Sequence, residues 1–226
     1  MYCVERYVAS CVLAVVLAGA PTVVLAADVG NDPDCKQRYW GPYDPKPGHP
    51  TAAEQQAFIE KIVPLAQKAE ERFRVPAAAI AAMAMQESGY GYTRTALNAH
   101  NLFGFKVPKN GPPGGRGKYT LVCQPKEDRG KDYIVFRDYA DTVSFVAERL
   151  ATLPRYAQIT AEYAAIPRDK RTKDDIVAWV YRVAKAGYNC CPEQYRQQIS
   201  RIMNSPQSPS DRESASTLYA LSIPSQ

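Results

Sequence analysis

The chain has 226 residues, 46% of them hydrophobic, and a formal net charge of +5. This length suits one ordinary hydrophobic core and argues against two large domains. The positive charge favours residence on an anionic polymer such as a cell wall, a nucleic acid or a lipid surface. The lysines and arginines are scattered rather than striped, and no zinc-finger cysteine spacing occurs. Both observations argue against a nucleic-acid-binding module.

The first 26 residues have the pattern of an export signal. Residues 8–26 carry no charge, and the small-residue pattern that ends at Ala26 fits a cleavage site. An apolar run of this length that is not cleaved would be a membrane anchor, which is the alternative. We expect cleavage, a mature protein that begins near Ala27 in the periplasm or outside the cell, and no membrane span thereafter.

An irregular arm and two helices are expected next. Residues 27–50 are rich in Asp, Pro and Gly, which is typical of a linker or an irregular arm. Thr51 and Glu54 form a capping-box pattern, and helical spacing of apolar residues follows them up to residue 73. A second helix is predicted over residues 77–86. It is alanine-rich and apolar and ends before Gly89, so we expect it to be buried.

A loop, a hairpin and further helices complete the expected domain, which covers residues 51–203. Gly, Pro, Lys and Asn predict a loop over 107–117, and β-forming residues predict strands over 118–124 and 132–137. Helices are expected over about 141–153, 155–165, 173–186 and 192–203. The Ser- and Pro-rich tail, 204–226, is expected to be disordered, with docking of its 217–221 segment as the alternative. These elements predict an α+β fold that is mostly helical, with a small β-hairpin lobe.

Four cysteines remain after removal of the signal: Cys35, Cys123, Cys190 and Cys191. An even number in an exported protein favours disulfides, for which three connectivities are possible. A direct bond between the adjacent Cys190 and Cys191 would form a strained ring, so each is expected to reach Cys35 or Cys123. A zinc site is the alternative, but no Cys-x-x-Cys pair supports it. With only two histidines, we expect no metal, no cofactor and no histidine-based triad.

Glu87 is the candidate catalytic group that the residues alone indicate. It lies seven residues after Ile80 and four after Met83, so on a helix it shares their face and points toward the core or a cleft. Poor solvation raises the pKa of a carboxylic acid and keeps its proton available near neutral pH. A general acid that protonates a glycosidic oxygen needs this property. The alternative is a capping or salt-bridged glutamate at a helix end.

Several motifs follow one another in a recognisable order. They are Gln-Glu-Ser-Gly-Tyr-Gly at 86–91, Asn-Leu-Phe-Gly-Phe-Lys at 101–106, Phe-Arg-Asp-Tyr at 136–139, and Gly-Tyr-Asn at 187–189 followed by Tyr195. This set resembles glycoside hydrolase family 73, bacterial glucosaminidases that include autolysins and the muralytic domain of flagellar rod-cap proteins. The resemblance covers about residues 55–203.

The resemblance implies a lysozyme-like α+β fold and hydrolysis of the β-1,4 bond after N-acetylglucosamine in the glycan strands of peptidoglycan. By motif position, Glu87 corresponds to the catalytic acid of the family. Asn101, Phe103 and Gly104 fall in the turn that borders the cleft. Tyr188 matches a family tyrosine placed opposite the acid, although the family's following Ala-Thr is Asn-Cys here.

Aromatic rings are candidates for stacking on sugar faces. The resemblance points to Phe103, Tyr119 and Tyr188 for this role. Packing in the core is the alternative for each ring. Tyr188 has the stronger case for a place in the site, because glycine and asparagine flank it.

The second carboxylate of the family pattern is not in its expected place. Many members carry a glutamate on the hairpin, and counting back from the Phe-Arg pair leads to Cys123 instead. Either Glu127 in the hairpin turn reaches the cleft, or the acetamido group of the substrate assists, with Tyr188 orienting it. The hairpin and the Tyr188 loop face each other in the family. The resemblance therefore implies a disulfide from Cys123 to Cys190 or Cys191, with Cys35 joined to the other.

Two further functions remain open from the sequence. Lytic transglycosylases and goose-type lysozymes also end their catalytic helix in Glu-Ser, but they typically continue to a Gly-Leu-Met-Gln segment that this chain lacks. A non-catalytic peptidoglycan-binding module would keep the cleft and lose the chemistry. The cysteine at the expected position of the second acid favours this non-catalytic module.

Overall fold

The computed structural model describes residues 40–125, 128, 130–205 and 217–223. Seven α-helices and a two-stranded antiparallel sheet form its regular elements. The α-helices are α2 (Ala52–Phe73), α3 (Ala77–Ser88), α4 (Arg94–Ala99), α5 (Tyr139–Thr152), α6 (Pro154–Ala165), α7 (Lys173–Val183) and α8 (Pro192–Asn204), and the strands are β1 (Lys118–Thr120) and β2 (Asp132–Ile134). The prediction of a mostly helical α+β fold with a small hairpin is confirmed.

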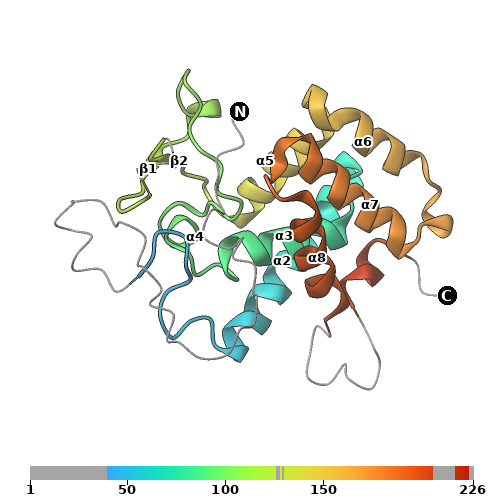
Figure 1. Cartoon of the computed structure of the whole chain (residues 1–226), viewed down its shortest axis with the longest axis horizontal. Helices are drawn as coiled ribbons and strands as arrows, with labels where there is room; N and C mark the ends of the chain where they lie inside the picture. The colour runs from blue at the N-terminus through green and yellow to red at the C-terminus, as the bar shows by residue number, and fades with distance from the viewer. Residues whose placement is uncertain (1–39, 126–127, 129, 206–216, 224–226) are drawn as a thin grey trace, which may run out of the picture.

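Helix α3 lies in the middle of the helical part (Figure 1). Every residue from Ala77 to Met85 is buried, and α2, α7 and α8 pack against it. Its alanines let neighbouring backbones approach closely, while Ile80 and Met83 fill the remaining space with no exposed area. Full burial of each such large apolar side chain contributes about 1.5–3 kcal/mol. The prediction of a buried second helix is confirmed.

Helix α2 begins with the capping box that its sequence predicts. The Thr51 hydroxyl accepts a hydrogen bond from the Glu54 N–H, and the Glu54 carboxylate accepts one from the Thr51 N–H, at 3.3 and 2.7 Å. The hydrogen bond from Thr51, followed by one from His49, lowers the pKa of Glu54 to about 2. The helix ends at Phe73, after which Arg74 takes the left-handed conformation.

The hairpin is shorter than the sequence predicts. Its pairs are Lys118 with Ile134, Tyr119 with Tyr133, and Thr120 with Asp132. Pairing of the named strands ends well before the expected residue 124. Cys123 has a φ of 69°, a left-handed conformation that cannot continue a strand. The hairpin and the loop before it form a lobe beside the helices, on the left in Figure 1.

Two local features were not expected from the sequence. The short helix α4 begins after Thr93, whose side chain accepts a hydrogen bond from the N–H of Ala96. Helix α7 gives way to a π-helical turn, η3 (Ala184–Tyr188), in which Gly187 has a φ of 99°. π-Helical turns are rare and frequently lie at functional sites.

The end of the described chain docks on the core. The 3₁₀ turn η5 (Leu218–Leu221) packs against α3 and α8, and its Leu218 and Tyr219 are buried. The Ser222 hydroxyl donates to the Glu70 carboxylate at 2.7 Å, and Arg171 donates to the same carboxylate at 2.6 Å. Docking of the 217–221 segment, the alternative to disorder, is therefore what the structure contains.

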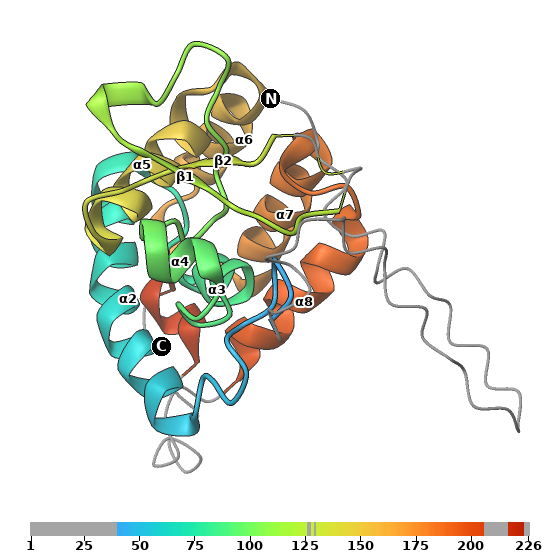
Figure 2. The ribbon, with the colours of Figure 1, turned by 90° about the vertical axis from the view of Figure 1, so that its left-hand side faces the viewer.

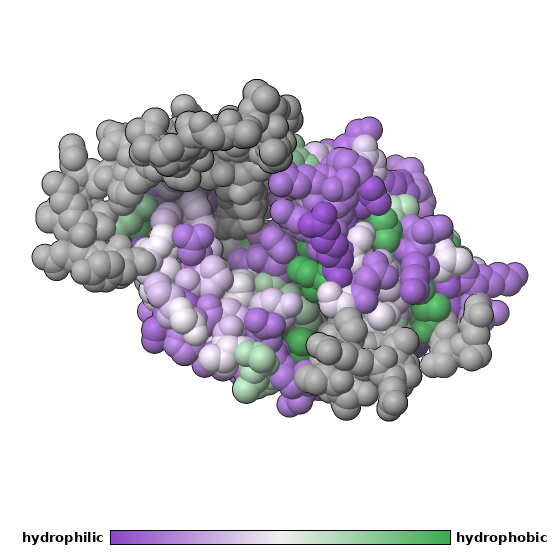
Figure 3. Space-filling model, turned by 60° about the horizontal axis from the view of Figure 1, so that its bottom comes forward, coloured by the Kyte–Doolittle hydropathy of each residue, from purple (hydrophilic) through white to green (hydrophobic). Residues whose placement is uncertain are grey.

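The described surface is largely polar. Among the described residues, the large hydrophobic side chain that is exposed to solvent is that of Leu97, with an exposed fraction of 44%. In Figure 3 the face that comes forward is mostly hydrophilic, with small, separate hydrophobic areas. Within the described ranges, no helix is both long and apolar enough to cross a membrane.

Removal of Arg171 should destabilise the fold. Arg171→Leu leaves the buried Glu70 carboxylate without its cation, and breaking a buried ion pair in this way costs about 3–5 kcal/mol. Urea unfolding measures the loss. The matched control is Lys170→Leu, at an exposed position next to it. Equal stability of the two variants would contradict a structural role for the Glu70 cluster.

Candidate active site

Glu87 stands near the point where α3 leaves the core. The nine residues from Ala77 to Met85 are buried, whereas Glu87 is half-buried in the last turn of the helix. The side chain of Glu87 is therefore partly accessible to solvent. The half-buried position of Glu87 is what the structure contains, while a poorly solvated carboxyl group and its catalytic role stay predictions.

A tight turn fixes the helix end that carries Glu87. The Ser88 hydroxyl donates to the Ala84 carbonyl at 2.6 Å and accepts from the Gly91 N–H at 2.8 Å. Gly89 and Tyr90 both take left-handed conformations, with φ values of 53° and 54°. Burial raises the pKa of Tyr90, so its phenol stays protonated. The glycines of the motif thus allow an abrupt reversal directly after the candidate acid.

The side chain of Asn101 holds the second motif, residues 101–106, in place by hydrogen bonds. Its amide nitrogen donates to the carbonyls of Phe105 and Ile134, and its oxygen accepts from the Phe105 N–H, with distances of 2.8–2.9 Å. The side chain is fully buried. In this structure Asn101 joins the 101–105 turn to strand β2 and presents no surface to a substrate.

The other predicted sugar contacts differ in exposure. Phe103 is 3% exposed and belongs to the hydrophobic core. The structure therefore fits packing of its ring in the core, which was the alternative to stacking on a sugar. Gly104 is half-buried, with a φ of 61°. Tyr119 is half-buried on β1, where its hydroxyl accepts a hydrogen bond from Asn98 at 3.5 Å.

Tyr188 closes the π-helical turn η3. It is half-buried, and its ring packs against that of Tyr195 on α8, with centroids 5.8 Å apart. The Asn189 N–H donates to the Ala184 carbonyl at 3.3 Å, which completes the turn. The ring of Tyr188 is thereby held against α8.

The hairpin turn is held at Asp128, while Glu127 lies outside the described residues. The Asp128 carboxylate is buried and accepts hydrogen bonds from Tyr43 and from Lys106, with which it forms an ion pair. A carboxylate bound on both sides in this way serves to position the turn. Both partners of Asp128 come from segments that are distant in the sequence.

The 40–50 arm packs onto the site. Arg94, which is buried in α4, donates to the carbonyls of Trp40 in the arm and Val122 in the hairpin. A Cβ placed on Gly89 would lie 2.5 Å from Cγ of Pro45, so the arm touches the turn that follows Glu87. Figure 2 shows this segment, in blue, running beside α3 and α4. This docking was not predicted from the sequence, although Trp40 and Tyr43 within the Pro- and Gly-rich arm could have indicated it.

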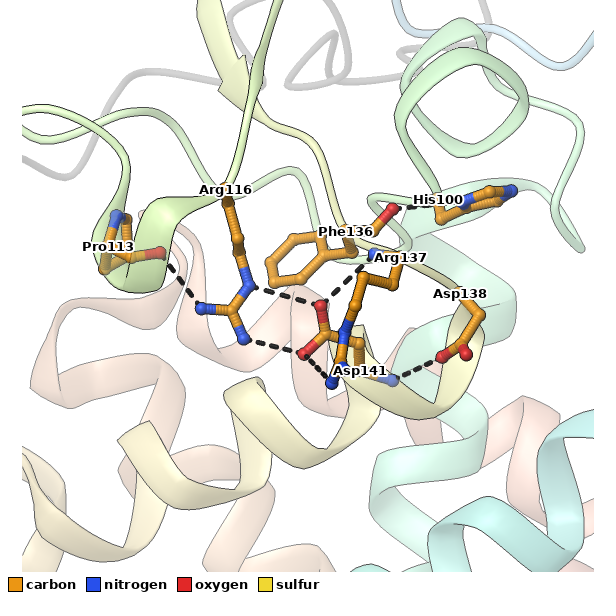
Figure 4. Close-up of polar contacts among 7 residues, drawn as sticks. All are labelled: His100, Pro113, Arg116, Phe136, Arg137, Asp138 and Asp141. Carbon is orange, nitrogen blue, oxygen red and sulfur yellow. Dashed lines mark hydrogen bonds and ion pairs between the residues drawn. The ribbon is translucent and has the colours of Figure 1, made fainter.

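The Phe-Arg-Asp-Tyr motif connects the hairpin lobe to α5 (Figure 4). Arg116, in the loop before β1, makes two hydrogen bonds to the Asp141 carboxylate, at 2.6 and 3.2 Å. Asp138 caps α5, since its carboxylate accepts from the Asp141 N–H at 2.8 Å. Burial opposes the charge on Asp141, but the hydrogen bonds from Arg116 and Arg137 outweigh it and hold its pKa below the usual value. The ion pair fixes the loop relative to the helices.

The structure corrects the predicted disulfides. Cys190 and Cys191 are reduced thiols whose Sγ atoms lie 3.6 Å apart. Neither is bonded to Cys123, because both are free thiols in the structure. Cys35 lies outside the described residues. Within the part of the chain that the structure describes, no group of three or more His, Cys, Asp or Glu side chains is arranged to hold a metal ion.

The family of the chain follows from comparison with known proteins. A family model described as mannosyl-glycoprotein endo-beta-N-acetylglucosaminidase matches residues 63–208, well over half of the chain. The chain belongs to this glucosaminidase family. Its members are glycoside hydrolases, so the protein is an enzyme of that class. A comparison with curated protein sequences finds no match.

Solved structures support the same fold. A peptidoglycan hydrolase from Sphingomonas sp. A1 aligns with a TM-score of 0.53 and 22% identity, over 71% of this chain and 95% of that one. An N-acetylmuramoyl-L-alanine amidase from Staphylococcus aureus aligns with a TM-score of 0.51 and 16% identity, over 77% of this chain and 46% of that one. At these identities the likeness establishes the fold alone, which is lysozyme-like as predicted.

Loss of the Tyr43 hydroxyl should loosen the arm. Tyr43→Phe removes a hydrogen bond to a buried carboxylate, a contact worth about 1.5–3 kcal/mol. The Lys46 N–H, which donates to the Tyr92 carbonyl, should then exchange with solvent about tenfold faster or more. Tyr181→Phe on α7 is the control. Unchanged exchange at Lys46 in the Tyr43 variant would show that the arm does not depend on Asp128.

Proposed function

We propose that this protein hydrolyses the β-1,4 glycosidic bond that follows N-acetylglucosamine in peptidoglycan, with Glu87 as the general acid. The observation that carries the proposal is the position of Glu87: a half-buried carboxylic acid at the end of a buried helix, followed by a turn with fixed hydrogen bonds, in a member of the glucosaminidase family. The similarity in fold to a peptidoglycan hydrolase supports the choice of substrate.

Glu87 acts on the leaving group. Its carboxylic acid gives a proton to the glycosidic oxygen as the bond from that oxygen to the sugar breaks, which avoids expulsion of an alkoxide. The sugar develops the charge of an oxocarbenium ion in this step. A turn that fixes the end of α3 keeps the acid in place, since proton transfer needs hydrogen-bond distance to the oxygen.

The substrate supplies the second group. The Asp128 carboxylate already binds Lys106 and Tyr43, and Cys123 occupies the position where the family pattern places a glutamate. We therefore assign the attack on the sugar carbon to the carbonyl oxygen of the substrate's own acetamido group, an established alternative to two carboxylates. Water then opens the cyclic intermediate. Tyr188 orients the acetamido group, and Glu127 contributes little.

We assign contact with the sugar to the half-buried residues. Tyr119 and Tyr188 offer ring faces for stacking, and Gly104 leaves room for a sugar beside the backbone. The buried Asn101 and Phe103 support the turn from within. The net charge of +5 adds a general attraction to the anionic wall polymer.

The site of action follows from the leader and the cysteines. We propose export, with cleavage near Ala27, and a disulfide between Cys35 and Cys123. Arg94 binds the carbonyls of Trp40 and Val122, which are five residues and one residue away from these cysteines. Five extended residues span about 17 Å, so the connection is within reach. A bridge there would tie the arm to the hairpin in an oxidising compartment.

Replacement of the acid tests the function. Glu87→Gln is nearly isosteric but cannot donate an acidic proton, so we expect turnover of a soluble glycan fragment to fall about a hundred- to ten-thousandfold. Circular dichroism and thermal unfolding should match the parent protein. Glu148→Gln, at an exposed carboxylate on α5, is the control and should keep full activity. Parent-like turnover by a folded Glu87→Gln variant would end the assignment.

A further inference from the structure

The pair of thiols at Cys190 and Cys191 lies outside the chemistry assigned above. Cys190 is exposed, Cys191 is half-buried, and their Sγ atoms are 3.6 Å apart. Both precede α8 directly and follow Tyr188 by only two and three residues. Two neighbouring thiols that reach solvent can react together with a single oxidant.

A disulfide between adjacent residues differs from an ordinary structural one. The Cα atoms of neighbouring residues are about 3.8 Å apart, whereas disulfides usually join Cα atoms about 4.4–6.8 Å apart. The bond is therefore strained and is reduced more readily than a relaxed bridge. Strained or exposed disulfides are the labile and regulatory ones, while relaxed ones hold folds together.

We propose that Cys190 and Cys191 form a reversible thiol–disulfide exchange site whose reaction partner is a disulfide, carried either by a small molecule or by another protein. The thiolate of the exposed Cys190 attacks one sulfur of the partner and displaces the first thiolate. The thiolate of Cys191 then attacks the Cys190 sulfur, forms the intramolecular disulfide and releases the second thiolate. The partner gains two electrons, and the two protons lost by the cysteines go to the released thiolates.

The reaction also changes the loop that holds Tyr188. The Cys191 N–H donates to the Asn189 side chain at 2.9 Å, and the Cys191 carbonyl accepts from the Tyr195 N–H at 2.9 Å. Closing the ring forces the backbone between the two cysteines into a new conformation, which competes with both hydrogen bonds. Tyr195 is also the ring against which Tyr188 packs. Oxidation therefore loosens the Tyr188 contact, and its effect on catalysis rests on the proposed function.

Mass spectrometry tests the exchange site without any substrate. The full-length protein is equilibrated with oxidised glutathione, quenched with acid, alkylated and digested. We expect the peptide that holds both cysteines to lose both alkylation sites together and two hydrogens in mass, and to recover them in excess reduced glutathione. Cys191→Ser should retain glutathione on Cys190 as a mixed disulfide. A parent protein that keeps both thiols, or that stops at the mixed disulfide, would overturn the proposal.

Two further measurements test the link to the loop. In the oxidised parent protein the Tyr195 N–H, whose acceptor is the Cys191 carbonyl, should exchange faster than in the reduced protein, and this difference should be absent in Cys191→Ser. Hydrolysis by the oxidised form should be about tenfold slower, the cost of about one hydrogen bond near the reacting sugar. Ring formation with unchanged exchange at Tyr195 would contradict the loop coupling. An inactive reduced protein that still forms the ring would contradict the proposed function and leave the exchange site intact.

Discussion

The burial of α3 on all its sides is the constraint on which the rest of the structure depends. Alanines from Ala77 onward let three helices pack closely around α3. This helix therefore reaches solvent only at its last turn, where Glu87 lies. The reversal after that turn needs Gly89 in a left-handed conformation and the Ser88 hydroxyl as an internal link. Glu87, which is the acidic residue of α3, therefore stands at the edge of the core.

Buried polar groups join the segments around this helix end. Arg94 connects the arm to the hairpin, Asp128 connects the hairpin turn to Lys106 and Tyr43, and Arg116 with Asp141 connects the preceding loop to α5. Each is a charge-assisted contact between segments distant in sequence, and such contacts specify geometry as well as stabilise it. The arm therefore packs against the turn that follows Glu87.

Local signals explain what the sequence predicted well. The Thr51 capping box, the apolar run of α3 and the left-handed Gly89 depend on neighbours within a few residues. The features that the sequence did not predict depend on long-range contacts. Burial of Asn101 becomes evident only once β2 lies beside its turn, and the predicted strand ends at Thr120, ahead of the left-handed Cys123. For Cys190, ring strain argued for a distant partner, but the fold leaves its thiol beside that of its neighbour.

Product analysis of digested peptidoglycan is the most direct test of the proposed chemistry. Purified sacculi are incubated with the protein, and the ends of the released fragments are identified by mass spectrometry. Hydrolysis after N-acetylglucosamine predicts fragments with N-acetylglucosamine at the reducing end. Anhydro-muramic ends would instead identify a lytic transglycosylase. Binding to the sacculi by a folded protein without any release would identify a non-catalytic module, and either result would contradict the account.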